Sequence, residues 1–148
     1  MNKRLQSPAR QEGGFTLIEL LVVILIIGIL AAIAIPVYLN QRRKAVHAAM
    51  KSDARTMATK QESYFVDNTA YLPIAASTGT ALVGAETVTL APGDTVTVTL
   101  NTAGQAYCVL ITNPKGSTGS TTTGVVYVSS LGGLQLSAVT SCPLPGAF

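Results

Sequence analysis

The sequence GFTLIELLVVILIIGILAAIAIPV, residues 14–37, decides the architecture of this chain. It is long enough to cross a membrane as a helix, since about 20 apolar residues suffice. It nevertheless carries a carboxylate, Glu19, close to its start. Because a charged side chain in a bilayer core costs roughly 2.5–3.5 kcal/mol, we expect Glu19 to have a partner. Cleavage between Gly14 and Phe15 would create one, a free α-amino group four residues away.

Three interpretations of this N-terminus compete. A secretory signal has a basic start, a short apolar core and small residues at its cut site, and Ala32-Ile33-Ala34 would fit, releasing a secreted binding domain. The apolar run is long for such a signal. A plain transmembrane anchor explains the length but leaves Glu19 and Gly13-Gly14 without a role. Cleavage ahead of the run keeps the hydrophobic helix in the mature protein and gives Glu19 its partner.

The composition and charge of the chain predict neither a large aromatic core nor a general nucleic-acid-binding function. Of the 148 residues, 48% are hydrophobic, 11% charged and 5% aromatic, and tryptophan is absent, so a large aromatic core is not expected. The first fourteen residues hold three basic side chains and one acidic, and the rest hold seven and six. The pI near 9.0 is therefore partly a property of the N-terminus. It gives no broad case for nucleic-acid binding.

The two cysteines, Cys108 and Cys142, both lie far from the apolar run. In a small exported domain they indicate most simply one disulfide. Such a bridge closes a loop of about 35 residues and contributes roughly 4 kcal/mol in the chain-entropy model. Two buried free thiols are the alternative. Neither cysteine has zinc-site or redox spacing, and His47 could not complete a zinc site.

The stretch from Gly14 to Val23 resembles the class III signal junction of type IV pilins and their pseudopilin relatives. The match covers about residues 13–44. This resemblance implies that a prepilin peptidase cuts after Gly14 and methylates the new N-terminal residue, Phe15. It also implies that Glu19 pairs with the terminal amine of another subunit during assembly.

The resemblance also settles a topology that charge leaves open. Lys3, Arg4 and Arg10 favour a cytoplasmic N-terminus under the positive-inside rule. Arg42-Arg43-Lys44 flank the other end of the run almost equally. The family implies a leader, residues 1–14, on the inside and the chain after the helix outside. The precursor is then a single-pass protein of the cytoplasmic membrane and the product an extracellular pilus.

Helix formers continue beyond the apolar run, which predicts one long kinked α-helix of 52 residues, roughly 78 Å long. Residues 15–39 form its hydrophobic transmembrane and assembly half, and residues 40–66 its amphipathic half. Gly28 and Pro36 both weaken a helix, and the proline predicts a kink. In pilins the stretch between equivalent residues can lose helicity in the filament. The resemblance therefore implies the same for residues 28–36.

The amphipathic half carries a narrow apolar stripe that we expect to pack against a globular head, residues 67–148. Its members recur at spacings of four and seven: Val46, Met50, Met57 and Tyr64. After the helix we expect an irregular stretch from Tyr71 to about Glu86. Strands with alternating hydroxyl and aliphatic residues then follow at Thr87–Leu90 and Thr95–Leu100.

Turn residues set the expected strand order. Pro92-Gly93-Asp94 should join these two strands, and Asn101–Gly104 should turn into a strand that ends at Thr112. In that last strand, one face should hold Tyr107, Val109 and Ile111, and the other Cys108 and Leu110. After the loop Asn113–Gly124, further strands are expected at Gly124–Ser129 and Gly133–Val139. The fold class is α+β: the pilin fold, a long helix on a four- to five-stranded antiparallel sheet.

The sequence contains no catalytic or metal-binding motif that we can identify. Asp67 and Asp94 are too isolated to suggest calcium by spacing. We expect His47 to be a solvated residue on the helix surface. No enzyme activity, cofactor or metal is therefore expected. We interpret the Ser/Thr-rich loop at 117–123 as a plain flexible loop rather than a site for O-glycans.

The expected function is that of a structural subunit of a type IV pilus, a homo-oligomeric helical filament for adhesion, motility or DNA uptake. Its partners would be the prepilin peptidase, the assembly machinery and, before assembly, membrane lipid. The alternative is a pseudopilin of a type II secretion or competence system. The C-terminal disulfide and the lack of an acidic calcium loop favour a major pilin. DNA binding would rest only on Arg42, Arg43 and Lys44, which we interpret as lipid-headgroup or helix-flank charges.

Overall fold

The computed structural model describes residues 14–116, 124–135, 141–143 and 146. Two compact units divide the chain, Met1–Tyr38 and Leu39–Phe148, and each is described by itself. Helix α1, Leu17–Asn68, contributes to both. Of the expected leader, only Gly14 falls among the described residues.

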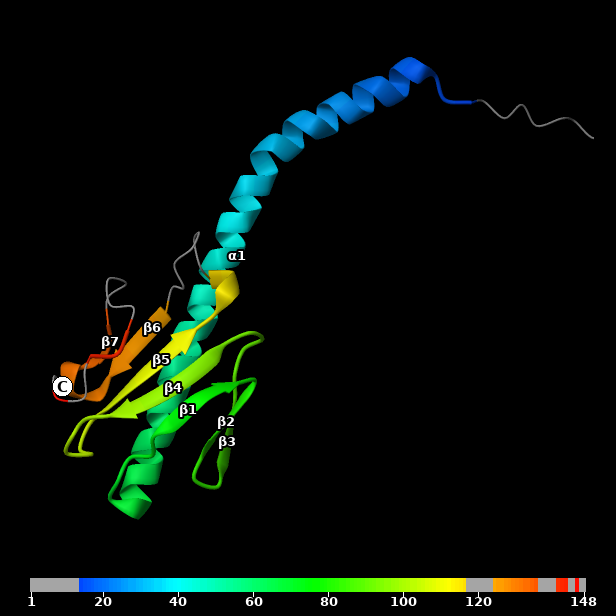
Figure 1. The fold of residues 1–148 in the computed structure, drawn as a ribbon. Helices are drawn as coiled ribbons and strands as arrows, with labels where there is room; N and C mark the ends of the chain where they lie inside the picture. The colour runs from blue at the N-terminus through cyan, green and yellow to red at the C-terminus, as the bar shows by residue number, and fades with distance from the viewer. Residues whose placement is uncertain (1–13, 117–123, 136–140, 144–145, 147–148) are drawn as a thin grey trace, which may run out of the picture. The chain divides into compact units, whose positions relative to one another are not determined.

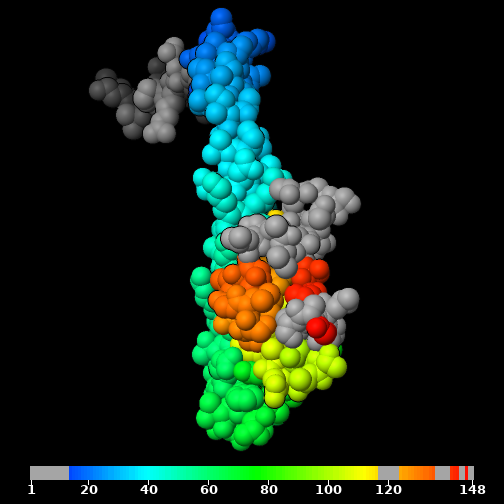
Figure 2. Space-filling model, turned by 90° about the vertical axis from the view of Figure 1, so that its left-hand side faces the viewer, coloured from blue at the N-terminus to red at the C-terminus, as the bar shows by residue number. Residues whose placement is uncertain are grey.

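In the first unit, the large apolar side chains of α1 are exposed, and Figure 2 shows this part of the helix in blue. Every large hydrophobic residue that the structure describes in this unit is at least 46% exposed. Among the described residues, α1 is the one helix long and apolar enough to cross a membrane. Its helical conformation is unbroken at Gly28 and Pro36, and loss of helicity there stays a prediction.

In the second unit, the rest of α1 lies along one face of an antiparallel sheet (Figure 1). The described strands are β1 Ile74–Thr78, β2 Thr80–Val83, β3 Glu86–Thr89, β4 Thr95–Leu100, β5 Tyr107–Thr112, β6 Gly124–Val128 and β7 Gly133–Leu134. Two 3-10 turns, η1 Pro114–Gly116 and η2 Ser129–Leu131, complete the elements. One sheet has the order β1-β4-β5-β6-β7, while β2 and β3 form a second, two-stranded sheet. The α+β, pilin-like fold class is therefore confirmed.

The main hydrophobic core lies between α1 and the sheet face that covers it. The helix contributes Met50, Ala54, Met57 and Ala58, and the central strands contribute Val96, Val98, Tyr107, Val109 and Ile111. Val46 and Tyr64 pack at its margin, so the predicted apolar stripe is confirmed. The alternation along β5 is also as predicted, because Cys108 lies in a separate cluster with Val126 and Val128. A disulfide joins Cys108 to Cys142 and so fixes the chain around residue 142 to that second face.

Two expectations about the strands are wrong. The stretch from Tyr71 to Glu86 is not irregular, since it holds β1 and β2. Strands β3 and β4 do not form a hairpin either, because β3 pairs with β2 while β4 pairs with β1 and β5. The turn at Pro92-Gly93-Asp94 exists, with Asp94 N–H donating to the Ala91 carbonyl at 2.9 Å. It carries the chain from one sheet to the other.

Strand β3 pairs with β2 rather than with β4 because the turn between β2 and β3 is a tight hairpin. Gly84 has a φ of 62°, the conformation that a tight two-residue hairpin demands of its first residue. A Cβ at this position would lie 2.7 Å from the Tyr64 ring of α1, so the hairpin turn packs directly on the helix. The β2–β3 pairing is thus local and leaves β1 to complete the larger sheet.

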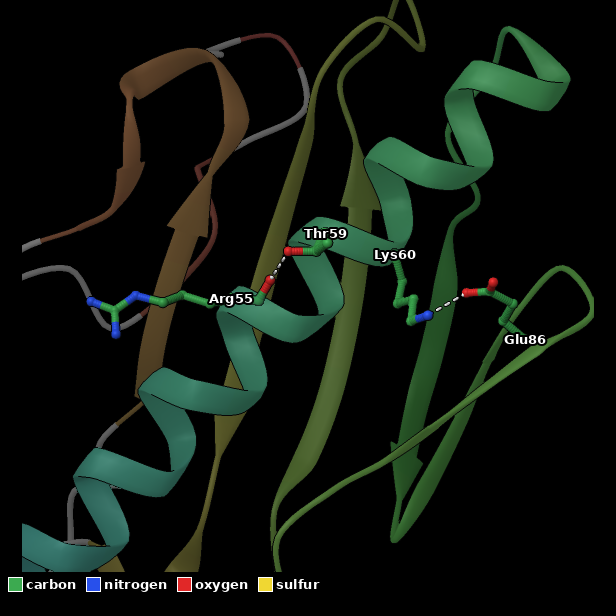
Figure 3. A network of polar contacts seen from close by, with 4 residues as sticks. All are labelled: Arg55, Thr59, Lys60 and Glu86. Carbon is green, nitrogen blue, oxygen red and sulfur yellow. Dashed lines mark hydrogen bonds and ion pairs between the residues drawn. The ribbon is translucent and has the colours of Figure 1, made fainter.

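An ion pair joins the same hairpin to the helix. Lys60 Nζ lies 2.7 Å from Glu86 Oε2 on β3, and Figure 3 shows the two side chains reaching toward each other. The residue before Lys60 is Thr59, whose hydroxyl donates to the Arg55 carbonyl at 3.0 Å. Both partners of the ion pair are partly exposed, so its contribution to stability is small, on the order of 0.5 kcal/mol.

Polar anchors inside the second unit fix the helix against the head. Tyr107 is fully buried, and its one hydroxyl proton is shared between Glu62 Oε1, at 2.9 Å from the hydroxyl oxygen, and the Ala58 carbonyl, at 3.2 Å. The buried amide of Gln61 exchanges two hydrogen bonds with the backbone of Leu72, at 2.8 and 3.0 Å. A buried amide needs both partners. This pair therefore fixes the chain where it leaves the helix.

Two expectations concern the C-terminal part of the chain: the last strand and the Ser/Thr-rich loop. The strand Gly133–Val139 is present at Gly133–Leu134, while residues 136–139 lie outside the described residues. The Ser/Thr-rich segment 117–123 also lies outside them, so its glycosylation is untested.

Replacing Tyr107 by Phe should destabilise the head by about 1.5 kcal/mol, because a hydrogen bond to a charged group is lost while the ring still fills the core. Chemical unfolding of the full chain in detergent, followed by circular dichroism, measures this. Tyr38→Phe is the matched control, since Tyr38 is 66% exposed. Equal stability of the Tyr107→Phe and Tyr38→Phe variants would show that the hydroxyl anchors nothing.

Candidate processing and assembly site

The expected cleavage site lies just ahead of α1. Gly14 and Phe15 precede the first helical residue, Leu17. The Phe15 side chain is 83% exposed, and a Cβ on Gly14 would meet no atom within 4 Å. An exposed, non-helical backbone is what a peptidase needs to bind its substrate. The structure therefore leaves this bond accessible.

Thr16 and Glu19 form a reciprocal capping box at the start of α1. Glu19 Oε2 accepts hydrogen bonds from the Thr16 backbone N–H at 2.9 Å and from its hydroxyl at 2.7 Å. In return, Glu19 N–H donates to Thr16 Oγ1 at 3.3 Å. Two backbone N–H groups that the helix itself cannot satisfy thus gain partners. The carboxylate also lies at the positive end of the helix dipole.

This cap changes the interpretation of Glu19. From the sequence we expected its partner to be a separate α-amino group, whereas the structure supplies a local partner, Thr16. The cap engages Oε2, while Oε1 takes part in no hydrogen bond within the described part of the chain. Glu19 is therefore oriented by its own helix with one oxygen left open. The signal was present in the sequence, since Thr-x-x-Glu before an apolar run is the pattern of a capping box.

Glu19 lies on an apolar face of the helix. Together with Phe15, Ile18, Val22 and Val23 it lines a shallow surface hollow of about 390 Å³. These positions follow the helical repeat and so share one side of α1. Anything that packs on this face removes water from the open oxygen. A cation in the packing partner would then be needed to compensate the charge.

The structure offers no metal centre among the residues it describes: no three His, Cys, Asp or Glu side chains gather there. The expectation of a solvated His47 is wrong. Its ring is half-buried, and Nε2 lies 3.1 Å from the Gly116 carbonyl. Since a carbonyl only accepts, Nε2–H is the donor. His47 thus fixes η1 to the helix, far along the chain from the cleavage site.

The fold and the N-terminal segment define a class of protein. Residues 9–35 match the family described as the prokaryotic N-terminal methylation motif. The chain therefore carries that motif, and its predicted resemblance to type IV pilins and their relatives is confirmed.

More particular similarities come from curated relatives. The chain is 42% identical over 62 residues to type II secretion system core protein G of Pseudomonas aeruginosa, covering 42% of this chain and 44% of the relative. It is 41% identical over 71 residues to the type IV major pilin protein PilA of Myxococcus xanthus, covering 48% and 32%. The type IV wide pilus major component PilA4 of Thermus thermophilus is 45% identical over 62 residues, covering 42% and 47%.

The similarity is thus partial. The chain spans less than half the length of each of these relatives. No solved structure gives a significant match. Both named classes, pilus components and a secretion-system component, match less than half of this chain.

Thr16→Ala should weaken the start of α1 by about 1 kcal/mol, because the N-cap side chain is lost. Amide hydrogen exchange of residues 17–20, measured by NMR on the mature protein in micelles, should then be roughly fivefold faster. Thr16→Ser keeps the hydroxyl and should exchange like the wild type. Unchanged protection in Thr16→Ala would mean that the cap does not hold the first turn.

Proposed function

We propose that the chain is the precursor of a structural subunit of a type IV pilus. Prepilin peptidase cuts it after Gly14 and methylates Phe15. Before assembly the subunit spans the cytoplasmic membrane once, in contact with lipid. The assembly machinery there then moves it into an extracellular homo-oligomeric filament. The methylation motif, the pilin relatives and the single apolar helix support this proposal.

The observation that carries the proposal is the half-satisfied carboxylate of Glu19. Thr16 holds Oε2 while Oε1 stays open on an apolar face. Packing this face against another helix would desolvate a charge, which costs several kcal/mol unless an opposite charge comes with it. The α-ammonium group of a neighbouring subunit's Phe15 supplies that charge. The pairing fixes the axial register between neighbouring helices.

The apolar side chains around the first unit supply the rest of the contact. These side chains face lipid tails in the membrane and other helices in a bundle. Because both surroundings are apolar, packing and hydrogen bonding, rather than the hydrophobic effect, determine whether the helix moves from lipid into the bundle. We further propose that residues 28–36 lose helicity in the filament, since Gly28 and Pro36 both weaken the helix there. Faster amide hydrogen exchange at these residues in filaments than in micelles would show it.

A pseudopilin of a type II secretion system is the second candidate. The observation in its favour is the match to core protein G, which is 42% identical over 62 residues, against 41% over 71 residues for the pilin PilA. Both candidates are structural subunits rather than enzymes. Electron microscopy separates them: a pilin forms surface filaments that disappear when its gene is deleted. A pseudopilin deletion leaves surface filaments and stops secretion.

Glu19→Gln is the sharpest test of the carboxylate, because glutamine still serves a capping box but carries no charge. We expect filaments to fall by about 100-fold or more, as the loss of one partner of a buried ion pair costs about 3–5 kcal/mol. Electron-microscopic counting measures the filaments, and immunoblotting of membranes checks that the subunit is present. Asp67→Asn, at an exposed acid late in α1, is the control. Normal filament numbers in Glu19→Gln would contradict the register role of Glu19.

Intact mass spectrometry of the purified protein distinguishes the proposal from the remaining alternatives. We expect a chain that begins at Phe15 and carries one added methyl group. A chain that begins at Ile35 would instead identify a secreted domain, and an uncut chain a plain membrane anchor. Gly14→Val should block cleavage, because a bulky residue replaces glycine at an otherwise open position.

A further inference from the structure

A buried polar cluster lies where the turn Ala91–Asp94 meets α1, within the second unit. Asp94 ends this turn and has no exposed surface. Asp53 approaches it from α1, and Asn113, 2% exposed, approaches from the residue after β5. None of these residues takes part in the proposed assembly chemistry. A fully buried carboxyl group beside another carboxyl group is unusual and needs a physical explanation.

The hydrogen bonds around the cluster fix the orientation of each side chain. Asn113 Oδ1 accepts from the Lys115 backbone N–H at 2.9 Å, so its Nδ2 must point the other way. That Nδ2 donates to Asp94 Oδ1 and, at 3.3 Å, to the Pro92 carbonyl. From the helix, Asp53 Oδ2 accepts the Ala91 N–H at 2.7 Å. The turn is therefore held from two sides.

One oxygen of the cluster remains without a donor. Asp94 Oδ2 is buried and receives no hydrogen bond from a donor among the described residues, and the neighbouring titratable group is the carboxyl of Asp53. Two ionised carboxylates cannot bond to each other, because both only accept. No cation compensates them either: within the described ranges the one ion pair is Lys60 with Glu86, and Asn113 is neutral. Two charges here would repel each other, and the fully buried Asp94 has no contact with water that could screen its charge.

Protonation of one carboxyl group removes both problems. Its O–H becomes a donor to the other carboxylate, which supplies the missing hydrogen bond, and a single negative charge remains. Burial raises the pKa of Asp94, which the Asn113 amide opposes and the neighbouring Asp53 carboxyl reinforces. A metal ion fits less well, since calcium takes six to eight oxygen ligands and the described residues offer no group of three acidic or imidazole ligands.

We propose that the partly buried Asp53 and the fully buried Asp94 form a site that binds one proton, and that this shared proton latches the turn Ala91–Asp94 onto α1. The turn carries the chain from β3 to β4 and thus from the small sheet to the large one. The latch therefore fixes the junction of both sheets against the helix. The head thereby becomes sensitive to pH at this junction.

The sign of the pH effect follows from the direction of the shift. An unfolded Asp titrates near pH 3.9, and Asp94 in the folded head titrates higher. The stabilisation from the shared proton is fully present below the unfolded pKa. It is lost as the pH rises through the folded pKa, because the folded state then gives up a proton that the unfolded state has already lost. Higher pH should thus loosen the turn.

Thermal unfolding of the mature full-length chain in detergent micelles, followed by circular dichroism from about pH 4 to about pH 9, tests the latch. We expect the wild-type Tm to fall by roughly 5 °C or more across this range. Asp94→Asn should remove that fall, because the amide N–H can donate a hydrogen bond to Asp53 and does not titrate in this range. Asp67→Asn alters an exposed acid and should keep the wild-type slope. Equal slopes for the wild type and Asp94→Asn would overturn the proposal.

Two further measurements keep the test decisive if Asp94→Asn fails to fold. In the wild type, ¹³C NMR of the aspartate carboxyl carbons should show one group that titrates well above the ordinary range, and Asp53→Asn should remove it. Ordinary titration of every aspartate would overturn the proposal. A fall of the wild-type Tm on adding EDTA would also overturn it, because a bound metal ion would then occupy the site.

Discussion

The carboxylate of Glu19, set in an otherwise apolar helical surface, is the constraint on which the rest of the molecule depends. The capping box with Thr16 satisfies one of its oxygens, so a single subunit tolerates the charge at the start of its helix. Packing against a second helix removes water from the other oxygen and makes a cation necessary. The carboxylate thus has a local partner in the single chain, while under the proposed function the bundle requires the neighbour's amine.

The same helix organises the head. Three polar side chains of α1 each fix a different segment: Gln61 the chain after the helix, Glu62 the start of β5 through Tyr107, and Asp53 the turn before β4. Between them the apolar stripe fills the core. On the far face of the sheet, the disulfide joins the C-terminal segment to β5. Helix α1 is therefore an integral part of the head's core and holds three of its segments in place.

The sequence predicted the features that depend on local pattern. The helix length follows from a continuous run of helix-forming residues, and the β4–β5 hairpin from the turn residues Asn101–Gly104. The apolar stripe and the alternation along β5 follow from periodicity. The segment Ile74–Thr78 gave no such signal, because its small residues form a strand only through pairing with β4. The β2–β3 hairpin had a signal in Gly84, a glycine between two alternating runs. Burial of Asp94 had none, since it depends on Asp53 and Asn113, which are distant in the chain.

The central claim is that Glu19 of one subunit meets the terminal amine of its neighbour. An electron cryo-microscopy structure of the assembled filament tests it most directly, through the distance from the Phe15 nitrogen to the neighbouring Glu19 carboxylate. The proposed pairing predicts a separation within about 4 Å, the limit of an ion pair. A Glu19 bonded only to its own Thr16, with the neighbour's amine beyond that reach, would contradict it.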